Sequence, residues 1–405
     1  MRALVGALAF LAATSVAAQA GDDAVAAIKS GTIGIELRAR FEQVSQDEYS
    51  DDARATTTRL RLNYKTAAWR NWSAFAEFDH VFNALLDDYD SGGGTSPSNV
   101  GVYPVIADPD GSDLNQLYLD YKVMPNWSWR FGRQRILLDN QRFVGGVGWR
   151  QNEQTYDAVS LTTTAAKKTT LFYSYIGQVR RIFGQTVAAG HSNVDTHLLN
   201  AKISLRDAWS LTPYFYYIDD HDAAVNSTST LGARISGDVS VAAGKIAVLA
   251  EFATQSDAAD APVGFDAGYM HLSATWTNGR GWSLGAGLET LGGSQSAGEA
   301  FRTPLATLHA FNGWADKFLT TPNAGLEDLY ASAGFAAGQW NLSGVLHDFS
   351  AQSGSGDFGS EIDVSAQRKL GAHYGLLFKA AFFSAATSSS LTDTDKFWVM
   401  LTASY

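Results

Sequence analysis

Hydrophobic and polar residues alternate one by one along many segments of this chain, beginning near residue 33. In the segment 35–42, one set of alternate positions is apolar and the other is charged: Ile35, Leu37, Ala39 and Phe41 against Glu36, Arg38, Arg40 and Glu42. A period of two places successive side chains on opposite faces of a β-strand, whereas a helix would need a period of about 3.6. The pattern therefore predicts an all-β protein.

The same alternation predicts about 18 strands of roughly ten residues, which is the length that a tilted strand needs to cross a bilayer. We expect these strands near residues 33–43, 57–66, 71–82, 114–123, 127–136, 156–164, 168–177, 196–205, 211–218, 229–238, 243–254, 267–276, 282–291, 327–336, 340–349, 360–369, 373–383 and 395–405.

The predicted connections between strands alternate between short and long. Short ones are expected at 66–71, 123–127, 164–168, 205–211, 276–282, 336–340 and 369–373, and long ones at 82–114, 136–156, 177–196, 254–267 and 291–327. An up-and-down antiparallel barrel in an outer membrane has tight periplasmic turns and longer outer loops. The alternation therefore favours a transmembrane β-barrel over a soluble β-sandwich.

Tryptophans gather beside the short connections, where they predict a periplasmic girdle because the indole ring prefers the bilayer interface. They are Trp69, Trp72, Trp127, Trp129, Trp209, Trp282 and Trp340. The last ten residues, KFWVMLTASY, also alternate and end on the aromatic Tyr405. We interpret them as the segment that the barrel-assembly machinery of the outer membrane recognises.

The composition agrees with a barrel that has one apolar and one polar face. Aromatic residues make up 12% of the chain, charged residues only 18%, and cysteine is absent. After residue 20 no apolar run approaches the roughly 20 residues of a transmembrane helix. The net charge of −11 argues against nucleic-acid partners, which require basic surfaces.

The first 20 residues have the three parts of a secretory signal peptide: the basic Arg2, an apolar core, and Ala18-Gln19-Ala20 before a cleavage site. We therefore divide the chain into a signal peptide at 1–20 and a barrel at 21–405. Export followed by insertion as a barrel predicts the bacterial outer membrane, with lipid and lipopolysaccharide as the surroundings.

Several arginines fall on the polar side of predicted strands and are expected to face the lumen: Arg38, Arg40, Arg59, Arg61 and Arg130. A ring of guanidinium groups in a narrow aqueous pore favours anions over cations. Carboxylates share the same faces, so the alternative is a ladder of arginine–carboxylate pairs that fills the barrel. The sequence leaves both roles open for each arginine.

Candidates for metal binding and catalysis are few. The segment DPDGSD, with Asp108, Asp110 and Asp113, resembles part of a calcium loop but lacks its bidentate glutamate, so a solvated acidic loop is favoured. No nucleophile elbow, zinc spacing or phosphate loop occurs. We therefore predict no cofactor, no other metal site, no catalytic residue and no enzymatic activity.

Two segments, 129–159 and 303–330, resemble the alginate-export family of outer-membrane porins, and the similarity extends over essentially the whole chain after residue 20. The resemblance implies an 18-stranded barrel with an arginine-lined constriction that passes acidic solutes. It adds Arg135, Arg142 and Arg150 of the first segment to the candidate pore residues. It places a mouth or gating loop in the second segment, with His309, Asn312, Trp314 and Asp316.

The sequence thus predicts a passive outer-membrane channel for polar, anionic solutes, either acidic oligo- or polysaccharides such as alginate or small organic anions. Two alternatives from other classes stay open at this point. One is a hydrolase embedded in a barrel, which would need a histidine to converge with a serine or an aspartate. The other is an occluded barrel with a structural or adhesive role.

Overall fold

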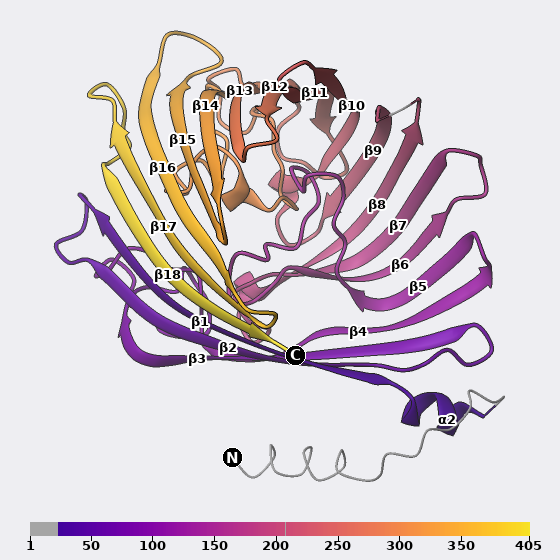
Figure 1. Cartoon of the computed structure of the whole chain (residues 1–405). Helices are drawn as coiled ribbons and strands as arrows, with labels where there is room; N and C mark the ends of the chain where they lie inside the picture. The colour runs from indigo at the N-terminus through magenta and orange to yellow at the C-terminus, as the bar shows by residue number, and fades with distance from the viewer. Residues whose placement is uncertain (1–22, 207) are drawn as a thin grey trace.

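Hydrogen-bonded strands follow one another in sequence order around the molecule. β1 (Thr32–Gln46) pairs with both β2 (Ala53–Lys65) and β18 (Thr394–Ser404), which closes the sheet into an 18-stranded barrel (Figure 1). Every neighbouring pair is antiparallel, so the topology is the predicted up-and-down one. The computed structural model describes residues 23–206 and 208–405, and the predicted signal peptide at 1–20 lies outside the described residues.

The other strands are β3 (Trp72–Asp88), β4 (Gly111–Met124), β5 (Trp127–Gln134), β6 (Thr155–Thr163), β7 (Thr169–Arg180), β8 (His191–Ser204), β9 (Ser210–Asp220), β10 (Thr228–Val241), β11 (Gly244–Asp257), β12 (Asp266–Thr277), β13 (Trp282–Leu291), β14 (Leu326–Ala337), β15 (Trp340–Ser350), β16 (Asp357–Leu370) and β17 (Tyr374–Ala385). The helix α2 (Ala24–Lys29) precedes β1. Short 3-10 turns lie in three connections: η1 (Ala188–Gly190), η2 (Ala224–Asn226) and η3 (Leu308–Ala310).

The predicted number and order of strands are confirmed, but several strands are longer than predicted. β3 continues to Asp88, six residues beyond the predicted range 71–82, and β8 begins at His191 rather than near residue 196. These extensions lie at the end of the barrel away from the short turns. Backbone pairing continues there after the apolar alternation has ended, so hydropathy alone could not detect it.

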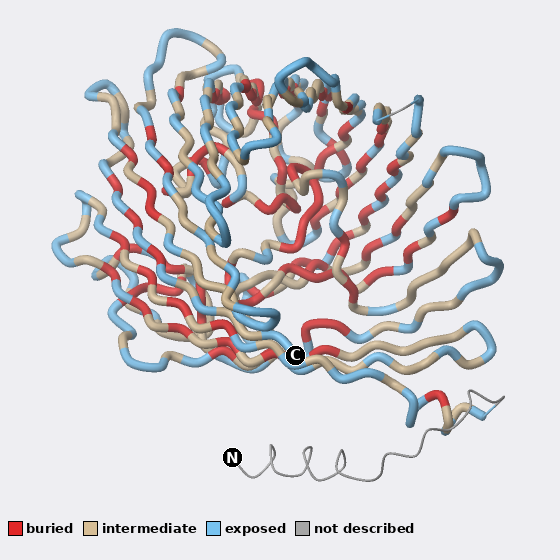
Figure 2. The backbone as a smooth tube through the Cα atoms, in the orientation of Figure 1, coloured by how far each residue is buried: buried red, intermediate tan, exposed pale blue. Residues whose placement is uncertain are grey.

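Alternation along each strand separates a lipid face from a lumen face. Leu37 and Leu346 point outward and are 42% and 56% exposed, whereas Arg38 and Arg40 point inward and are 7% and 2% exposed. Figure 2 shows this alternation of buried and exposed residues along the strands. The apolar residues therefore face the membrane and the polar residues are inside, the reverse of a soluble protein.

The short turns and the C-terminus lie at one end of the barrel, where tryptophans begin several strands. Trp72 opens β3 and stacks on Tyr121 at 4.4 Å between ring centroids, and Trp282 opens β13 at 4.4 Å from Phe335. This arrangement fits the girdle predicted from the sequence. None of the helices in the described residues is long and apolar enough to span a membrane.

Two long connections turn back into the barrel (Figures 1 and 2). They are the β5–β6 loop, residues 135–154, and the β13–β14 loop, residues 292–325. Inside the lumen they pair with each other through a parallel bridge between Val144 and Leu305, and the Gly145 amide donates to the Leu305 carbonyl at 2.8 Å. The two loops therefore form one body within the barrel.

Aromatic side chains pack this body against the wall. Phe143 of the β5–β6 loop and Phe301 of the β13–β14 loop lie 6.0 Å apart between ring centroids. Both also contact Tyr269 on β12, and Phe143 contacts Tyr214 on β9 at 5.2 Å. All four rings are buried, so burial of apolar surface fixes the position of the loops on this side.

Candidate functional site

Arginines of the β1 wall hold the β5–β6 loop by its backbone. The Arg38 guanidinium donates to the Gly148 carbonyl and to the Gln151 side chain, both at 2.9 Å. Arg40 donates to the Trp149 carbonyl and lies over the Trp149 ring at 4.4 Å from its centroid. Because strand side chains bind loop carbonyls, the inward course of the loop is specified at several points.

On β2, Arg61 connects wall carboxylates to the same loop. Its guanidinium makes two hydrogen bonds to Asp79 on β3, at 2.6 and 2.7 Å, and a third to Glu153 of the β5–β6 loop at 2.8 Å. Burial alone would raise the pKa of the Glu153 carboxyl, but Arg61 and Arg135 lower it to about 2. Glu153 is therefore ionised at neutral pH and carries the negative charge of this salt bridge.

A second charged cluster joins the two loops to each other. Arg150 of the β5–β6 loop donates to Asp316 of the β13–β14 loop at 3.2 Å and to Glu42 on β1 at 3.0 Å. Asp316 also accepts hydrogen bonds from Lys396 on β18 at 2.8 Å and from His309 at 2.7 Å. Burial opposes ionisation of Asp316, but His309 and Lys396 outweigh it and hold the pKa of Asp316 well below its usual value.

A third contact spans the barrel to the opposite wall. Arg142 of the β5–β6 loop donates to Glu289 on β13 at 2.8 Å and to the Asn312 side-chain oxygen at 3.1 Å. Asn312 in turn donates to Glu289 at 2.6 Å and to Asp328 on β14 at 3.2 Å. The β5–β6 loop therefore contacts β1 and β2 on one side and β13 on the other, and it crosses the lumen.

The end of the barrel opposite the short turns holds two adjoining cavities, of about 510 and 630 Å³. Both are lined by Arg181, Phe183, Pro304, Leu308 and Leu319, so together we name them the outer vestibule. The basic side chains of the outer vestibule are Arg142, Arg150, Arg181, Arg302, Lys317 and Lys396, against the carboxylates Glu48, Asp222 and Asp316. Its lining therefore carries more basic side chains than carboxylates, although Arg142, Arg150 and Arg181 are paired with carboxylates behind the lining.

Two of these cations form no salt bridge within the described part of the chain. Arg302 donates to the carbonyls of Val225 and Gly298, and Lys317 donates to the hydroxyl of Thr394 at 2.9 Å. Burial lowers the pKa of both the Arg302 guanidinium and the Lys317 ammonium. A neutral oxygen carries no counter-charge, and the nearby carboxylates Glu48, Glu361 and Asp393 act on Lys317 only from beyond salt-bridge distance. Both groups can therefore attract an anion.

A third cavity of about 640 Å³ lies near the short turns and includes Arg130 and Arg135. Arg130 pairs with Asp120 at 2.7 Å and covers the Tyr118 ring at 3.9 Å. The Arg130 side chain is 34% exposed, and that of Arg135 is 29% exposed. These two arginines retain surface toward the lumen while bound to carboxylates.

The eight predicted pore arginines thus fall into two groups. The first is buried and joins the wall to the inward loops: Arg38, Arg40, Arg59, Arg61, Arg142 and Arg150. The second, Arg130 and Arg135, is open to a cavity. Of the two roles that the sequence left open, salt bridging describes the contacts of five arginines of the first group, whereas Arg38 binds the Gln151 side chain and loop carbonyls. Contact of any of them with a solute stays a prediction.

The predicted gating residues all lie on the β13–β14 loop, inside the barrel. His309 and Asn312 are buried. Asp316 binds the wall by accepting from Lys396 on β18. The Trp314 amide binds the wall by donating to Asp363 on β16 at 3.2 Å. A role in gating stays a prediction. Their contacts show that they hold the loop in place.

Two carboxylates of the candidate calcium segment, for which the sequence favours a solvated acidic loop, bind other side chains and backbone groups. The buried Asp108 carboxylate accepts from Arg40 at 2.9 Å and from the Gln151 amide at 2.7 Å, and Asp113 accepts from Gln185. Burial opposes ionisation, but Arg40 and Arg150 outweigh it and lower the pKa of Asp108. Asp108 is therefore an anchor for the β5–β6 loop, because the buried guanidinium needs a counter-charge.

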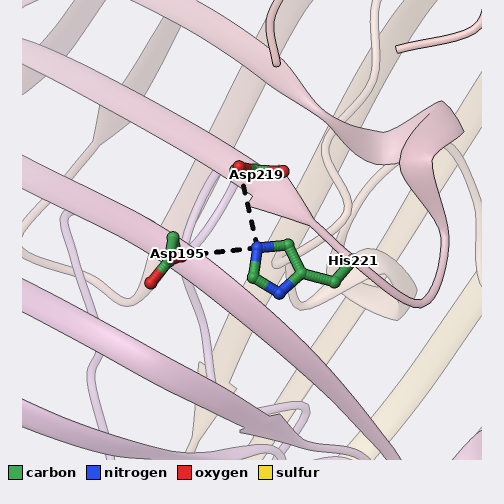
Figure 3. Close-up of side chains that lie close together, drawn as sticks. All are labelled: Asp195, Asp219 and His221. Carbon is green, nitrogen blue, oxygen red and sulfur yellow. Dashed lines mark ion pairs between the residues drawn. The ribbon is translucent and has the colours of Figure 1, made fainter. Parts of the chain in front are cut away.

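Among the described residues, one group of three could hold a metal ion: Asp195, Asp219 and His221. Asp195 and Asp219 are directly paired across β8 and β9, and the His221 imidazole lies 3.4 and 3.7 Å from their carboxylates (Figure 3). The alternation of these strands places both aspartates on the outer face. The group is therefore separate from the lumen.

Sequence reasoning missed Arg181, Arg302 and Lys317 in the outer vestibule, and Lys379 on β17. The three vestibule residues lie in connections without alternation, which give no indication of direction. Lys379 does occupy an inward position of an alternating strand, at 379 between Phe378 and Ala380. Its inward position could have been predicted, but its contacts could not.

Comparison with known proteins agrees with this architecture. The family model for alginate export matches residues 30–290, and no curated protein matches the chain by sequence. Among solved structures, Pseudomonas aeruginosa OccK8 (OprE) is similar with a TM-score of 0.71 and 16% identity, over 94% of this chain and 99% of that chain. Acinetobacter baumannii OccAB2 is similar with a TM-score of 0.74 and 12% identity, over 94% and 98% of the two chains. At such identities the likeness shows the porin fold alone.

Proposed function

This chain belongs to the alginate export family and forms a channel in the bacterial outer membrane rather than an enzyme, and we propose that the channel passes anionic solutes. The solutes would be acidic oligo- or polysaccharides such as alginate, or small organic anions. Lipid and lipopolysaccharide surround the barrel. Recognition of its final strand by the assembly machinery stays a prediction.

The observation that carries the proposal is the excess of basic side chains in the lining of the outer vestibule. Its basic side chains outnumber its carboxylates, and Arg302 and Lys317 form no salt bridge in the described residues. Cations within a concave, partly apolar surface raise the local concentration of anions and lower the barrier to their entry. The net charge of −11 would by itself suggest the opposite preference.

A separate cavity near the short turns also offers cations. Arg130 and Arg135 line it, together with Lys202. An anion that reached this cavity would meet guanidinium groups that already hold carboxylates, so it could exchange with Asp120 or Glu153 as the partner of an arginine. Such exchange keeps binding weak enough for release, which conduction requires.

The test is the reversal potential of the refolded protein in a planar bilayer under a salt gradient. We expect anion preference in the wild type and a clear reduction in the double variant Arg302→Gln, Lys317→Gln. The matched control is Arg280→Gln with Lys369→Gln, which removes the same charge from exposed residues near the short turns. Conductance blocked by oligouronates but not by neutral oligosaccharides would identify acidic saccharides as solutes.

Two results would contradict the proposal. Cation preference in the wild type would show that the vestibule does not set selectivity. The absence of any conductance from folded protein would favour the occluded barrel, because the two inward loops would then close the lumen.

A further inference from the structure

The side chain of Lys379 leaves the β17 wall and ends among three tryptophan rings. Its Nζ lies 3.7 Å from the ring centroid of Trp314, 4.2 Å from that of Trp149 and 5.4 Å from that of Trp398. Trp149 belongs to the β5–β6 loop, Trp314 to the β13–β14 loop and Trp398 to β18. One lysine of the wall therefore contacts both inward loops.

Hydrogen bonds fix the orientation of the groups around Lys379. Its ammonium lies 2.7 Å from His309 Nε2, and because an ammonium can only donate, Nε2 must accept. Nδ1 then carries the hydrogen and donates to Asp316 at 2.7 Å. Asp316 binds Arg150 and Lys396. Lys379 thus begins a chain of hydrogen bonds that ends on both loops and on β18.

The charge of Lys379 is balanced in an unusual way. No carboxylate forms a salt bridge with it in the described part of the chain: Asp316 and Asp363 act on the ammonium from a longer distance, and the ring faces of Trp314 and Trp149 lie directly against it. Cation–π contacts act at short range and need the rings to stay in position. Displacement of either loop would remove a ring, so the lysine and the loop positions depend on each other.

We propose that Lys379 is the positioning residue that holds the two inward loops against the wall and thereby fixes the width of the channel. The β5–β6 loop crosses the lumen, and the β13–β14 loop is bound to it through Val144 and Leu305. A shift of one loop at this contact would therefore be transmitted to the other loop. The inference rests on the channel assignment and is independent of the anion preference.

The test compares Lys379→Met with Lys379→Arg in single-channel recordings. Methionine keeps the length of the stem but removes the cation and the hydrogen-bond donor. We expect several conductance levels and about thirtyfold more time outside the main level, the loss expected for one desolvated cation–π contact. Arginine stacks on aromatic rings and donates to His309, so it should restore a single level.

Lys369→Met on the neighbouring strand β16 is the matched control. Lys369 is exposed, and this substitution removes the same charge as Lys379→Met. Trp314→Leu removes the nearest ring from the loop side and decides the question if Lys379→Met does not fold. In the double variant Lys379→Met, Trp314→Leu, the effects of the two substitutions on the time outside the main level should not add. A single wild-type level in both folded variants would overturn the proposal, whatever the reversal potential shows about anion preference.

Discussion

The Arg150 guanidinium and the Asp316 carboxylate meet at 3.2 Å inside the barrel, although the two residues belong to different loops. Each is also bound to the wall, Arg150 to Glu42 on β1 and Asp316 to Lys396 on β18. β1 and β18 are the strands whose pairing closes the barrel. The charged cluster therefore joins the closure of the barrel to the loops within it.

Replacement of Arg61 by alanine should lower the stability of the folded protein, and any change in ion selectivity should come with this loss of stability. The substitution would leave the buried Asp79 carboxylate without its salt-bridge partner, while Glu153 would keep Arg135, and the loss of one member of a buried pair costs about 3–5 kcal/mol. We expect a lower thermal midpoint and faster proteolysis within residues 135–154. Arg54→Ala is the control, since the Arg54 side chain is 52% exposed. A shift in reversal potential at unchanged stability would instead support direct contact of Arg61 with the solute.

Acid should release the inward loops through His309. Burial, with Lys379 nearby, lowers the pKa of docked His309 to about 3, whereas a free histidine has a pKa of about 6.5. Below about pH 6.5, His309 binds a proton more readily in the released loop than in the docked loop. Each further decrease of one pH unit therefore shifts the equilibrium between docked and released loop toward release by up to tenfold. Asp316 acts in the same direction at lower pH, because its pKa is depressed when docked and it stabilises docking only while ionised.

The measurement is the number of conductance levels and the open-channel noise between pH 8 and pH 4. The wild type should be constant above pH 6.5 and increasingly noisy below it. His309→Gln keeps an acceptor for Lys379 and a donor for Asp316 but cannot take up a proton, so it should flatten the profile. A wild type that is unchanged at pH 4 would argue against this role of His309.

A disulfide between the loops should suppress the effect of acid. Val144 and Leu305 are bridge partners, and the spacing of paired strands, about 4.8 Å, is within the range that a disulfide can join. The chain contains no cysteine, so Val144→Cys with Leu305→Cys should form one defined cross-link, seen as a mobility shift in non-reducing gels. We expect lower noise at pH 4 than in the reduced protein. Val144→Cys alone serves as the control.

An arginine on the outer face should impair insertion. Leu346 on β15 is 56% exposed and points to the lipid, where arginine costs about 2–4 kcal/mol near the bilayer midplane. Leu346→Arg should reduce the yield of folded protein in vesicles. Ser343→Arg, at an exposed inward position of the same strand, should fold as well as the wild type. Equal yields for the two variants would contradict the assignment of the faces.

The sequence by itself determined the strands and their faces. The period of two is a property of neighbouring residues. It recurs in every strand because the outer face of the barrel contacts lipid and the inner face contacts polar groups. Leu37 and Arg38 could therefore be assigned to opposite faces from their neighbours in the sequence alone. The inward position of Arg38, Arg40, Arg59 and Arg61 followed from the same rule. Resemblance to the alginate-export family further predicted which two segments would be distinctive.

Only the tertiary structure decided what those inward residues do. Residues 135–154 and 292–325 have no alternation, and their positions depend on partners far away in the chain, such as Glu42 for Arg150 and Glu289 for Arg142. Whether an arginine binds a carboxylate, a loop carbonyl or a solute depends on which groups arrive beside it. A periodic pattern carries no information about this, because such contacts are set by the three-dimensional course of two loops that cross the lumen and meet.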